Sequence, residues 1–296
     1  MDSSVFKFLS PFKGILSHCP GAVLRLRYWH RFHRCLNLKR PELFYDKIMW
    51  QSLNTDTTKW SELADKWAVR DFVAERCGKE VLTKCFGVWD RAEDVDWDAL
   101  PDSFVVKTTN GCASNVIVRD KSAVDLHDVE RRLAAWLRFP YGEVTGQKHY
   151  TRITPRVIAE ELLFQRDDPQ APLTDYKFYC FDGKPVYCMV MSNREFNTHD
   201  VDLMMYDMQW QTHPEFFDPG RRLTEVERPQ SREEMKRLVT ALSQGVSFVR
   251  VDFYEINGKP VFGEMTFMPG TDINLTLQAQ RDLGAMIDLN VANSKS

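Results

Sequence analysis

The sequence lacks the motifs of several common enzyme classes. It contains neither G-x-x-x-x-G-K-[S/T] nor G-x-G-x-x-G, so it predicts neither a P-loop nor a Rossmann-type nucleotide site. It also lacks G-x-S-x-G, the turn that carries the nucleophilic serine of α/β-hydrolases. No cysteine has a convincing local partner either, so nucleophilic catalysis through a side chain has little support.

The cysteines lack any metal-binding pattern. There are seven, no C-x-x-C occurs, and no Cys/His pair has the spacing of a zinc site. This usage favours reduced thiols in a cytoplasmic protein.

Long apolar runs are also absent. No run reaches the ~18 residues that a membrane helix needs, and the N-terminus lacks the uninterrupted apolar core of a signal peptide. With 43% hydrophobic and 27% charged residues, the composition is that of a globular protein with a sizeable core.

Positive charge gathers near the N-terminus, although the whole chain has a net charge of -3. Residues 25–34 read R-L-R-Y-W-H-R-F-H-R and mix cations with aromatic residues. One interpretation is an anionic partner: a nucleic acid, another anionic polymer, or the inner membrane surface, at which the protein would be peripheral. The other is a basic helix whose aromatic residues pack on the body of the protein.

Apolar spacing predicts a helix over residues 61–78, with Ser61 as N-cap and Gly78 just past its end. Further helices are expected over 128–137 and 231–243. The apolar residues expected on one face of the first helix are Leu63, Trp67 and Val73.

Strand patterns dominate after residue 103. They predict three antiparallel hairpins, and the second and third have Asp-Gly and Asn-Gly at their turns. A fourth β-rich run, 156–164, contains the paired acids Glu160 and Glu161. Such a strand edge could offer backbone groups to an adenine, or could simply run out into solvent. The predicted hairpins cover residues 104–118, 176–191 and 248–267.

Two acids of the last hairpin suggest a metal site. With the turn at 257 and 258, position 252 would pair near 263, and a bulge or a slip of one residue would bring Glu264 onto the face of Asp252. Two adjacent carboxylates repel unless a cation bridges them, and Mg²⁺ accepts such ligands. Alternatively, one acid pairs with Arg250 and the other faces water.

Four cations stand in separate elements: Lys66 on the first helix, and Lys107, Lys177 and Arg194 in or beside strands. Together they could bind phosphate, whereas each alone would usually be solvated surface. Spacing does not decide between these interpretations.

The motifs, in their order, resemble the ATP-grasp superfamily, and in detail its TupA-like branch, found in bacterial surface-polysaccharide biosynthesis. The resembling segments are K-I-M-W (47–50), A-D-K-W-A-V-R (64–70), L-P-D-S-F-V-V-K-T-T-N-G (100–111), P-R-V-I-A-E-E-L-L (155–163), D-Y-K-F-Y-C-F-D-G-K-P (175–185), S-N-R (192–194), F-V-R-V-D-F-Y (248–254) and F-G-E-M-T-F-M-P-G (262–270).

The resemblance implies an α+β ATP-grasp fold, in which two lobes with antiparallel sheets clamp ATP and a helical N-terminal segment precedes them. The expected parts are a basic extension (1–45), an N-terminal lobe (46–103), a small flap lobe (104–165) and a large lobe with the metal site (166–296).

The resemblance also implies ATP and Mg²⁺ as cofactors. Lys107 would contact the α- and β-phosphates, the loop 108–115 would cover them, and Arg70 could substitute for Lys66 near them. Glu160, Glu161 and Leu163 would hold the adenine, and Asp175 the ribose. The implied ATP-binding residues are Lys66, Lys107, Thr109, Asn110, Gly111, Ser114, Glu160, Glu161, Leu163 and Asp175.

The implied catalytic residues are Lys177, Arg194 and Arg250, and the implied metal ligands are Asp252, Glu264 and Thr266. Thr266 departs from the usual Glu-x-Asn pattern. The loop T-N-G-C-A-S also departs from the branch, because it has one glycine and a thiol at Cys112.

The expected function is a Mg-ATP-dependent carboxylate–amine ligase that acts through an acyl-phosphate. It would join an amino acid or amine to a sugar-linked or small-molecule carboxylate. The alternatives are a kinase of the same fold that phosphorylates a hydroxyl, and a glycosyltransferase-associated or non-catalytic nucleotide-binding protein.

Overall fold

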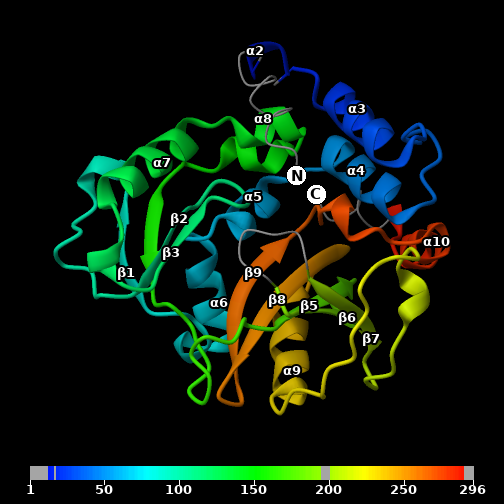
Figure 1. The fold of residues 1–296 in the computed structure, drawn as a ribbon. Helices are drawn as coiled ribbons and strands as arrows, with labels where there is room; N and C mark the ends of the chain where they lie inside the picture. The colour runs from blue at the N-terminus through cyan, green and yellow to red at the C-terminus, as the bar shows by residue number, and fades with distance from the viewer. Residues whose placement is uncertain (1–12, 17, 195–200, 290–296) are drawn as a thin grey trace. The chain divides into compact units, whose positions relative to one another are not determined.

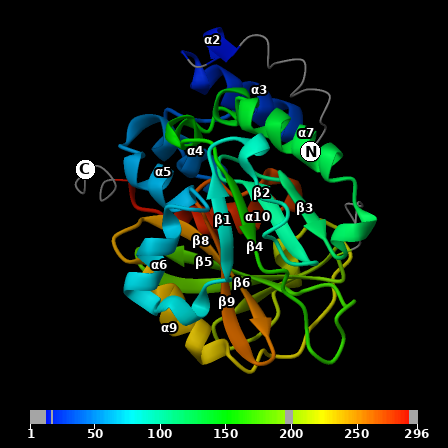
Figure 2. The same ribbon diagram turned by 90° about the vertical axis from the view of Figure 1, so that its left-hand side faces the viewer.

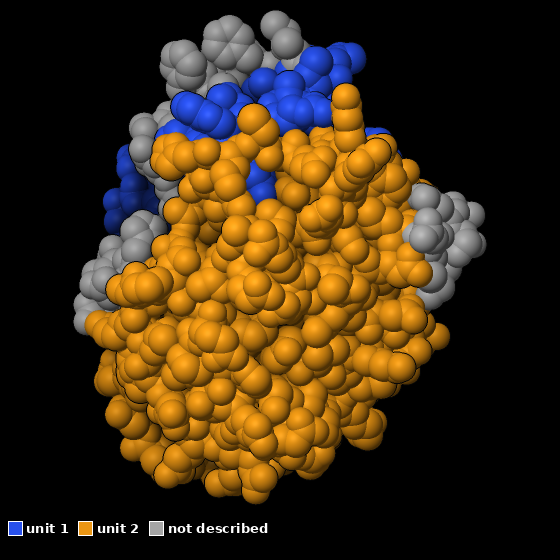
Figure 3. Space-filling model, turned by 90° about the vertical axis from the view of Figure 1, so that its right-hand side faces the viewer, with its two compact units in different colours: residues 1–30, 57–72, 82–163 blue, residues 31–56, 73–81, 164–296 orange. Residues whose placement is uncertain are grey.

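The computed structural model describes residues 13–16, 18–194 and 201–289. The chain divides into two compact units, which are coloured separately in Figure 3 and are described one at a time here. Unit 1 comprises residues 1–30, 57–72 and 82–163, and unit 2 comprises residues 31–56, 73–81 and 164–296. The four-part division expected from the sequence stays a prediction.

Among the described residues, five α-helices come before the first strand, and the longest of them is the basic helix α3. It begins at Pro20, a residue that fits the first turn because it has no N–H to leave unpaired. Tyr28 of α3 is buried, but Leu26 and Trp29 are 57% and 53% exposed. The helices are α2 (Lys13–Leu16), α3 (Pro20–Phe32), α4 (Phe44–Asn54), α5 (Thr58–Ala64) and α6 (Val69–Cys77).

The single helix predicted over 61–78 is wrong, because the chain forms α5 and α6 with a break between them. Asp65 ends α5, and its side chain accepts hydrogen bonds from the backbone N–H groups of Trp67 and Ala68. Aspartate competes in this way with the helical hydrogen-bond pattern. The break turns Trp67 outward, 39% exposed, whereas Leu63 and Val73 are buried as expected.

Unit 1 contains a four-stranded antiparallel sheet in the order β1-β4-β2-β3. Alternate residues of β2 are buried, and Phe104 and Val106 pack with Val129 and Leu133 of α7 in one core. Figure 2 shows these elements. They are β1 (Cys85–Trp89), β2 (Phe104–Thr108), β3 (Asn115–Val118), β4 (Val157–Glu160), α7 (Leu126–Arg138) and α8 (Tyr141–Thr145).

Register places Lys107 and Glu160 on the face of the sheet opposite this core. Val105 pairs with Glu160, and Lys107 pairs with Ile158 two residues further along both strands. Paired residues of antiparallel strands share a face, and so do residues two apart. The alternation that buries Phe104 and Val106 therefore presents Lys107 and Glu160 together.

Unit 2 contains a five-stranded antiparallel sheet in the order β7-β6-β5-β8-β9. Helix α9 packs on it and contacts β5, β6 and β8 (Figure 1). Both hairpins are confirmed: Asp182-Gly183 and Asn257-Gly258 have the positive φ angles that such two-residue turns require. The elements are β5 (Asp175–Phe181), β6 (Lys184–Ser192), β7 (Asp202–Asp207), α9 (Arg232–Ser243), β8 (Phe248–Ile256), β9 (Lys259–Thr266) and α10 (Leu277–Ala285).

Aromatic residues fill the core of unit 2. Phe44 of α4 is fully buried, and its ring meets that of Phe248 edge-to-face at 4.9 Å between centroids. Phe181 lies 5.1 Å from Phe248. The predicted α+β fold with antiparallel sheets is confirmed. In the part of the chain that the structure describes, no helix combines the length and apolarity needed to cross a bilayer.

Candidate active site

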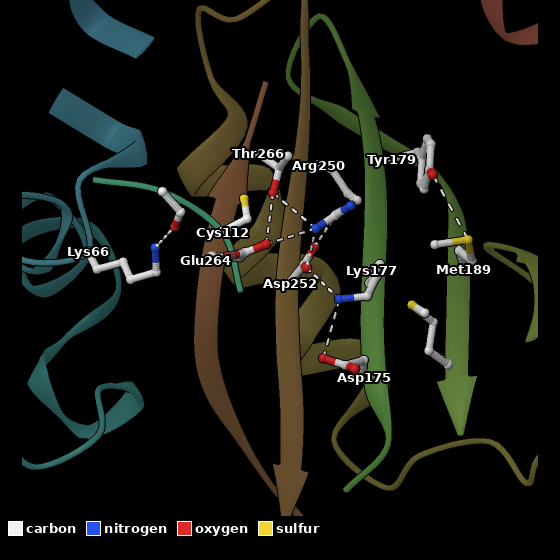
Figure 4. Close-up of polar contacts among 12 residues, drawn as sticks. Lys66, Cys112, Asp175, Lys177, Tyr179, Met189, Arg250, Asp252, Glu264 and Thr266 are labelled. Carbon is white, nitrogen blue, oxygen red and sulfur yellow. Dashed lines mark hydrogen bonds and ion pairs between the residues drawn. The ribbon is translucent and has the colours of Figure 1, made fainter. Parts of the chain in front are cut away.

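The neighbouring strands β5 and β8 of unit 2 carry a buried ion-pair cluster. Lys177 of β5 pairs in register with Asp252 of β8. Its Nζ lies 2.7 Å from Asp252 Oδ2 and 3.3 Å from Asp175 Oδ1, and Figure 4 shows these contacts. The side chain of Lys177 is only 9% exposed. The ammonium group therefore depends on these two carboxylates in place of water.

Arg250 connects this pair to the last strand, β9. Its Nε and one terminal nitrogen donate to the two oxygens of Asp252, both at 2.7 Å. The same terminal nitrogen lies 2.9 Å from Glu264 Oε1 and 3.0 Å from Thr266 Oγ1. Figure 4 shows the guanidinium beside both acids. Arg250 thus pairs with both carboxylates, and not with one alone.

The predicted approach of Asp252 and Glu264 is confirmed. They are register partners, and the strands shift by one residue between Asp252 and Phe253. Without this bulge, the Asn257-Gly258 turn would place Gly263 opposite Asp252. The two acids differ in exposure: the side chain of Asp252 is 3% exposed and that of Glu264 is 38% exposed.

The cluster balances its charges. Its acids are Asp175, Asp252 and Glu264, and its bases are Lys177, Arg194 and Arg250.

Burial by itself would lower the pKa of Lys177, but Asp252 and Asp175 raise it above its ordinary value. Burial also opposes ionisation of Arg250, and Asp252 and Glu264 again raise the pKa overall. Both groups therefore stay cationic at neutral pH.

The oxygen donors of this cluster suit Mg²⁺ in one particular way. Among the described residues, no group of three His, Cys, Asp or Glu side chains is arranged to hold a metal ion. Asp252 and Glu264 supply two carboxylates, and Mg²⁺ commonly binds through one or two carboxylates together with substrate phosphates. The residues therefore fit an ion that arrives with a nucleotide, and do not form a complete metal cage. Thr266 donates to Glu264 Oε1 at 3.1 Å.

In unit 1, the carboxylate of Glu160 gathers three partners. Lys107 Nζ forms an ion pair with Oε2, Arg70 donates to Oε1 at 2.6 Å, and Thr83 donates to Oε1 at 2.9 Å. Burial would raise the pKa of Glu160, but Lys107, Thr83 and Arg70 together hold it below its ordinary value. Glu160 thus stays ionised and fixes the position of Lys107.

Residues 161–163 follow directly after the last residue of β4. The backbone N–H of Glu161 donates to the carbonyl of Lys84 at 2.9 Å, so this N–H group is already hydrogen-bonded within the protein. Leu163 ends unit 1 and is partly buried. Their roles toward an adenine stay predictions.

The loop 108–115, called the phosphate loop from here on, joins β2 to β3. Thr108 Oγ1 donates to Ser114 Oγ at 2.8 Å, and Thr109 donates through its backbone N–H to the carbonyl of Arg156. Lys66 Nζ donates to the carbonyl of Gly111. Lys66 therefore contacts this loop, and its role toward phosphates stays a prediction.

Sequence reasoning missed the Glu160 contacts of Arg70 and Thr83. The sequence suggests Arg70 only as a substitute for Lys66, and it gives no indication of a role for Thr83. They stand 90 and 77 residues from Glu160, so no local spacing could have revealed the contacts.

The family model described as TupA-like ATP-grasp matches residues 46–288. The chain belongs to this family. Its α+β fold is the ATP-grasp fold, and the enzyme class expected from the sequence, an ATP-dependent ligase, agrees with this membership. A search of curated protein sequences finds no match.

Solved structures similar to this ATP-grasp chain include three ligases. A D-alanine–D-alanine ligase from Bacillus anthracis, complexed with ATP, is 15% identical at a TM-score of 0.48, with 80% of this chain and 68% of that chain covered. An L-amino acid ligase from Bacillus licheniformis is 15% identical at a TM-score of 0.48, with 85% and 55% covered. The ATP-grasp ligase PsnB, complexed with a minimal precursor, is 12% identical at 0.43, with 77% and 61% covered. The chain thus spans less than two thirds of the last two.

Proposed function

We propose that the protein is a Mg-ATP-dependent carboxylate–amine ligase. The observation that carries this proposal is the Arg250 guanidinium on both Asp252 and Glu264, with Lys177 on the other side of Asp252. This arrangement brings two fixed cations and two carboxylates together on one sheet. Such a set suits phosphoryl transfer, in which catalysis consists mostly of positioning and charge neutralisation.

In unit 1, Lys107 would bind the α- and β-phosphates, because Glu160 holds its ammonium group in a fixed position. The phosphate loop would add the backbone N–H groups of Asn110 and Gly111, and the Ser114 hydroxyl, as donors to phosphate oxygens. The N–H of Thr109 already donates to the carbonyl of Arg156, so Thr109 would hold the loop in place. Lys66, bound to the Gly111 carbonyl, would keep the loop in place and add positive charge. Glu160, Glu161 and Leu163 would lie beside the adenine.

In unit 2, Asp252, Glu264 and Thr266 would hold Mg²⁺. The bound ion would neutralise charge on the transferred phosphate. Arg250, Lys177 and Arg194 would stabilise the negative charge that develops during transfer. Both oxygens of Asp175 contact cations, namely Lys177 and Arg194, which favours a role in positioning those cations over the expected contact with ribose.

The proposed reaction has two steps. A substrate carboxylate oxygen attacks the γ-phosphorus of ATP, so that an acyl-phosphate forms and ADP leaves. An amine then attacks the acyl carbon, the carbon–oxygen bond to phosphate breaks, and phosphate leaves as the amine loses a proton. No protein nucleophile takes part, which agrees with the lack of a triad motif. The carboxylate would be sugar-linked or a small molecule, as in the polysaccharide context of the branch.

ADP release tests this function. The protein would be incubated with Mg-ATP and pairs drawn from a panel of amino acids and uronic acids, and the products analysed by mass spectrometry. A new amide together with free phosphate is the expected result. A stable phosphoester would instead identify a kinase, and no ADP with any pair, despite ATP binding, would indicate a binding protein.

A further inference from the structure

A cavity of about 380 Å³ lies within unit 1. Its lining combines Asn110 of the phosphate loop with residues between the end of α7 and Pro155. Small-molecule sites usually occupy about 300–1,000 Å³. The cavity is therefore large enough for a metabolite of the size of an amino acid.

Asn110, which lines this cavity, has a side-chain oxygen that is unpaired among the described residues. The residue is 6% exposed, and its side-chain oxygen is buried without a hydrogen-bond partner. Leaving such a group unpaired is unfavourable, because the group has lost its hydrogen bonds to water. The oxygen is covered by protein atoms, so a ligand in the cavity would reach it only after the Asn110 side chain rotates. An N–H or O–H group of the ligand would then satisfy it.

Two opposite charges line the same cavity. Arg138 is the last residue of α7, and Glu143 lies in the first turn of α8. Within the described part of the chain, neither side chain forms an ion pair. One free cation and one free anion in a single cavity match a ligand that carries both charges.

Aromatic rings form an apolar part of the wall. Tyr141 and Tyr150 meet edge-to-face, with 5.0 Å between their centroids. Burial raises the pKa of Tyr141 well above its ordinary value, so the phenol is neutral. Its ring can pack against hydrocarbon, and aromatic faces also attract an ammonium group.

The cavity is tied to the phosphate loop through Tyr141. A Cβ atom at Gly111 would lie 3.2 Å from the Tyr141 ring, so the loop backbone rests against this residue. Gly111 is also the residue whose carbonyl binds Lys66. A ligand in the cavity would therefore lie next to the loop that we assign to the phosphates.

We propose that this cavity binds the amine substrate as a zwitterionic α-amino acid. Its carboxylate would pair with Arg138, its ammonium group would meet Glu143 and the Asn110 oxygen, and its side chain would pack on Tyr141 and Tyr150. The assignment of this amino acid as the attacking amine rests on the proposed ligase function, whereas its binding does not. Among the residues expected to bind ATP, Asn110 then uses its side chain for the second substrate.

Calorimetric titration without ATP tests the binding. The probes are the proteinogenic L-amino acids at up to about 10 mM, which detects dissociation constants near 1 mM. For the best binder, the decarboxylated amine and the N-acetylated acid are titrated as well. We expect each analogue to bind about tenfold more weakly, because it lacks one charge.

Two variants identify the groups responsible. Arg138→Gln should weaken binding of the amino acid about tenfold and leave the affinity for the decarboxylated amine unchanged. Glu143→Gln should weaken binding of the amino acid and leave the affinity for the N-acetylated acid unchanged. Arg131→Gln and Glu130→Gln, also on α7 but outside the cavity lining, are the matched controls. Binding of no amino acid, or unchanged affinity in both cavity variants, would overturn the proposal.

Activity measurements distinguish a failure of the cavity assignment from a failure of the proposed ligase function. If an amide forms but Arg138→Gln does not raise the KM for the amine, the cavity assignment fails while the ligase function stands. If the amino acid binds as predicted but no acceptor carboxylate yields ADP, the cavity stands and the ligase function fails.

Discussion

Asp252 and Glu264 face each other across β8 and β9 because a bulge after Asp252 shifts the register by one residue. Arg250 binds both side chains, so their mutual repulsion is offset without a metal ion. The same residues are the oxygen ligands that we assign to Mg²⁺. Changing Glu264, the more exposed of the two, should therefore affect turnover more than folding.

Glu264→Gln keeps the size of the side chain and removes its charge. We expect turnover to fall at least about a hundredfold, as is typical when a charge-stabilising group is lost from an active site. The melting temperature should change little, because Glu264 is 38% exposed and Arg250 keeps both bonds to Asp252. Steady-state ADP release and thermal unfolding measure the two effects, and wild-type turnover would remove Glu264 from the metal site.

Thr266→Asn restores the amide of the usual Glu-x-Asn pattern. An amide oxygen is a better Mg²⁺ ligand than a hydroxyl, so the Mg²⁺ concentration at half-maximal activity should fall several-fold. Magnesium titrations of wild type and variant at saturating ATP provide the measurement. An unchanged or higher requirement would argue that position 266 does not contact the ion.

Lys107→Ala should weaken ATP binding about tenfold, the effect of losing roughly 1.4 kcal/mol. Glu160 would keep its bonds to Arg70 and Thr83, so the fold should persist. Calorimetric titration with ATP, together with a circular dichroism spectrum, tests both statements. Lys84→Ala, a change of a lysine of the same unit just before β1, is the control and should bind ATP normally. Equal affinities of the two variants would refute the phosphate role of Lys107.

His149 should make the protein less stable in mild acid. Burial lowers its pKa from 6.5 to about 3, so the unfolded chain takes up a proton at a pH where the folded protein does not. Stability is therefore complete above pH 6.5 and falls as the pH drops toward 3, by about 2 kcal/mol at pH 5.

Denaturant unfolding of wild type and His149→Gln at several pH values measures this contribution. The difference in unfolding free energy between the two proteins should shrink as the pH falls from 7 to 5. A difference that does not vary with pH would show that His149 takes up no proton on unfolding.

Helix α3 should bind anionic lipid vesicles through Trp29, Leu26 and the cations around them. Trp29 and Leu26 are more than half exposed, whereas Arg27 donates to the carbonyl of Thr145. The packing interpretation thus holds for Tyr28, whereas Trp29 keeps more than half of its surface exposed. Sedimentation with phosphatidylglycerol vesicles should show binding that weakens as salt rises. It should also weaken in the Leu26→Ser, Trp29→Ser double variant but not in Phe164→Ser, a change at another exposed aromatic residue. Binding that changes neither with salt nor with these substitutions would contradict this membrane role of α3.

Local turn chemistry made part of the site predictable. Asn257-Gly258 fixes the hairpin, and the hairpin fixes the spacing of Asp252 and Glu264 to within the one residue that the bulge supplies. By contrast, the contacts of Glu160 with Arg70 and Thr83 depend on how distant segments pack, which no local pattern encodes. The break at Asp65 was missed for another reason: a single side chain diverts two backbone N–H groups and outweighs the helical spacing around it.

Because the charges of the unit 2 cluster balance, the cluster should keep its order whether or not a metal ion is bound. Carboxylates that are held only by a metal ion lose their order when a chelator removes it. Here Lys177 and Arg250 already hold Asp252, so EDTA should leave the melting temperature nearly unchanged. An incoming Mg²⁺ would meet a site without surplus negative charge and should bind weakly by itself. The ion would bind tightly only when nucleotide phosphates bring additional negative charge, so loading of the metal would be controlled by the availability of ATP.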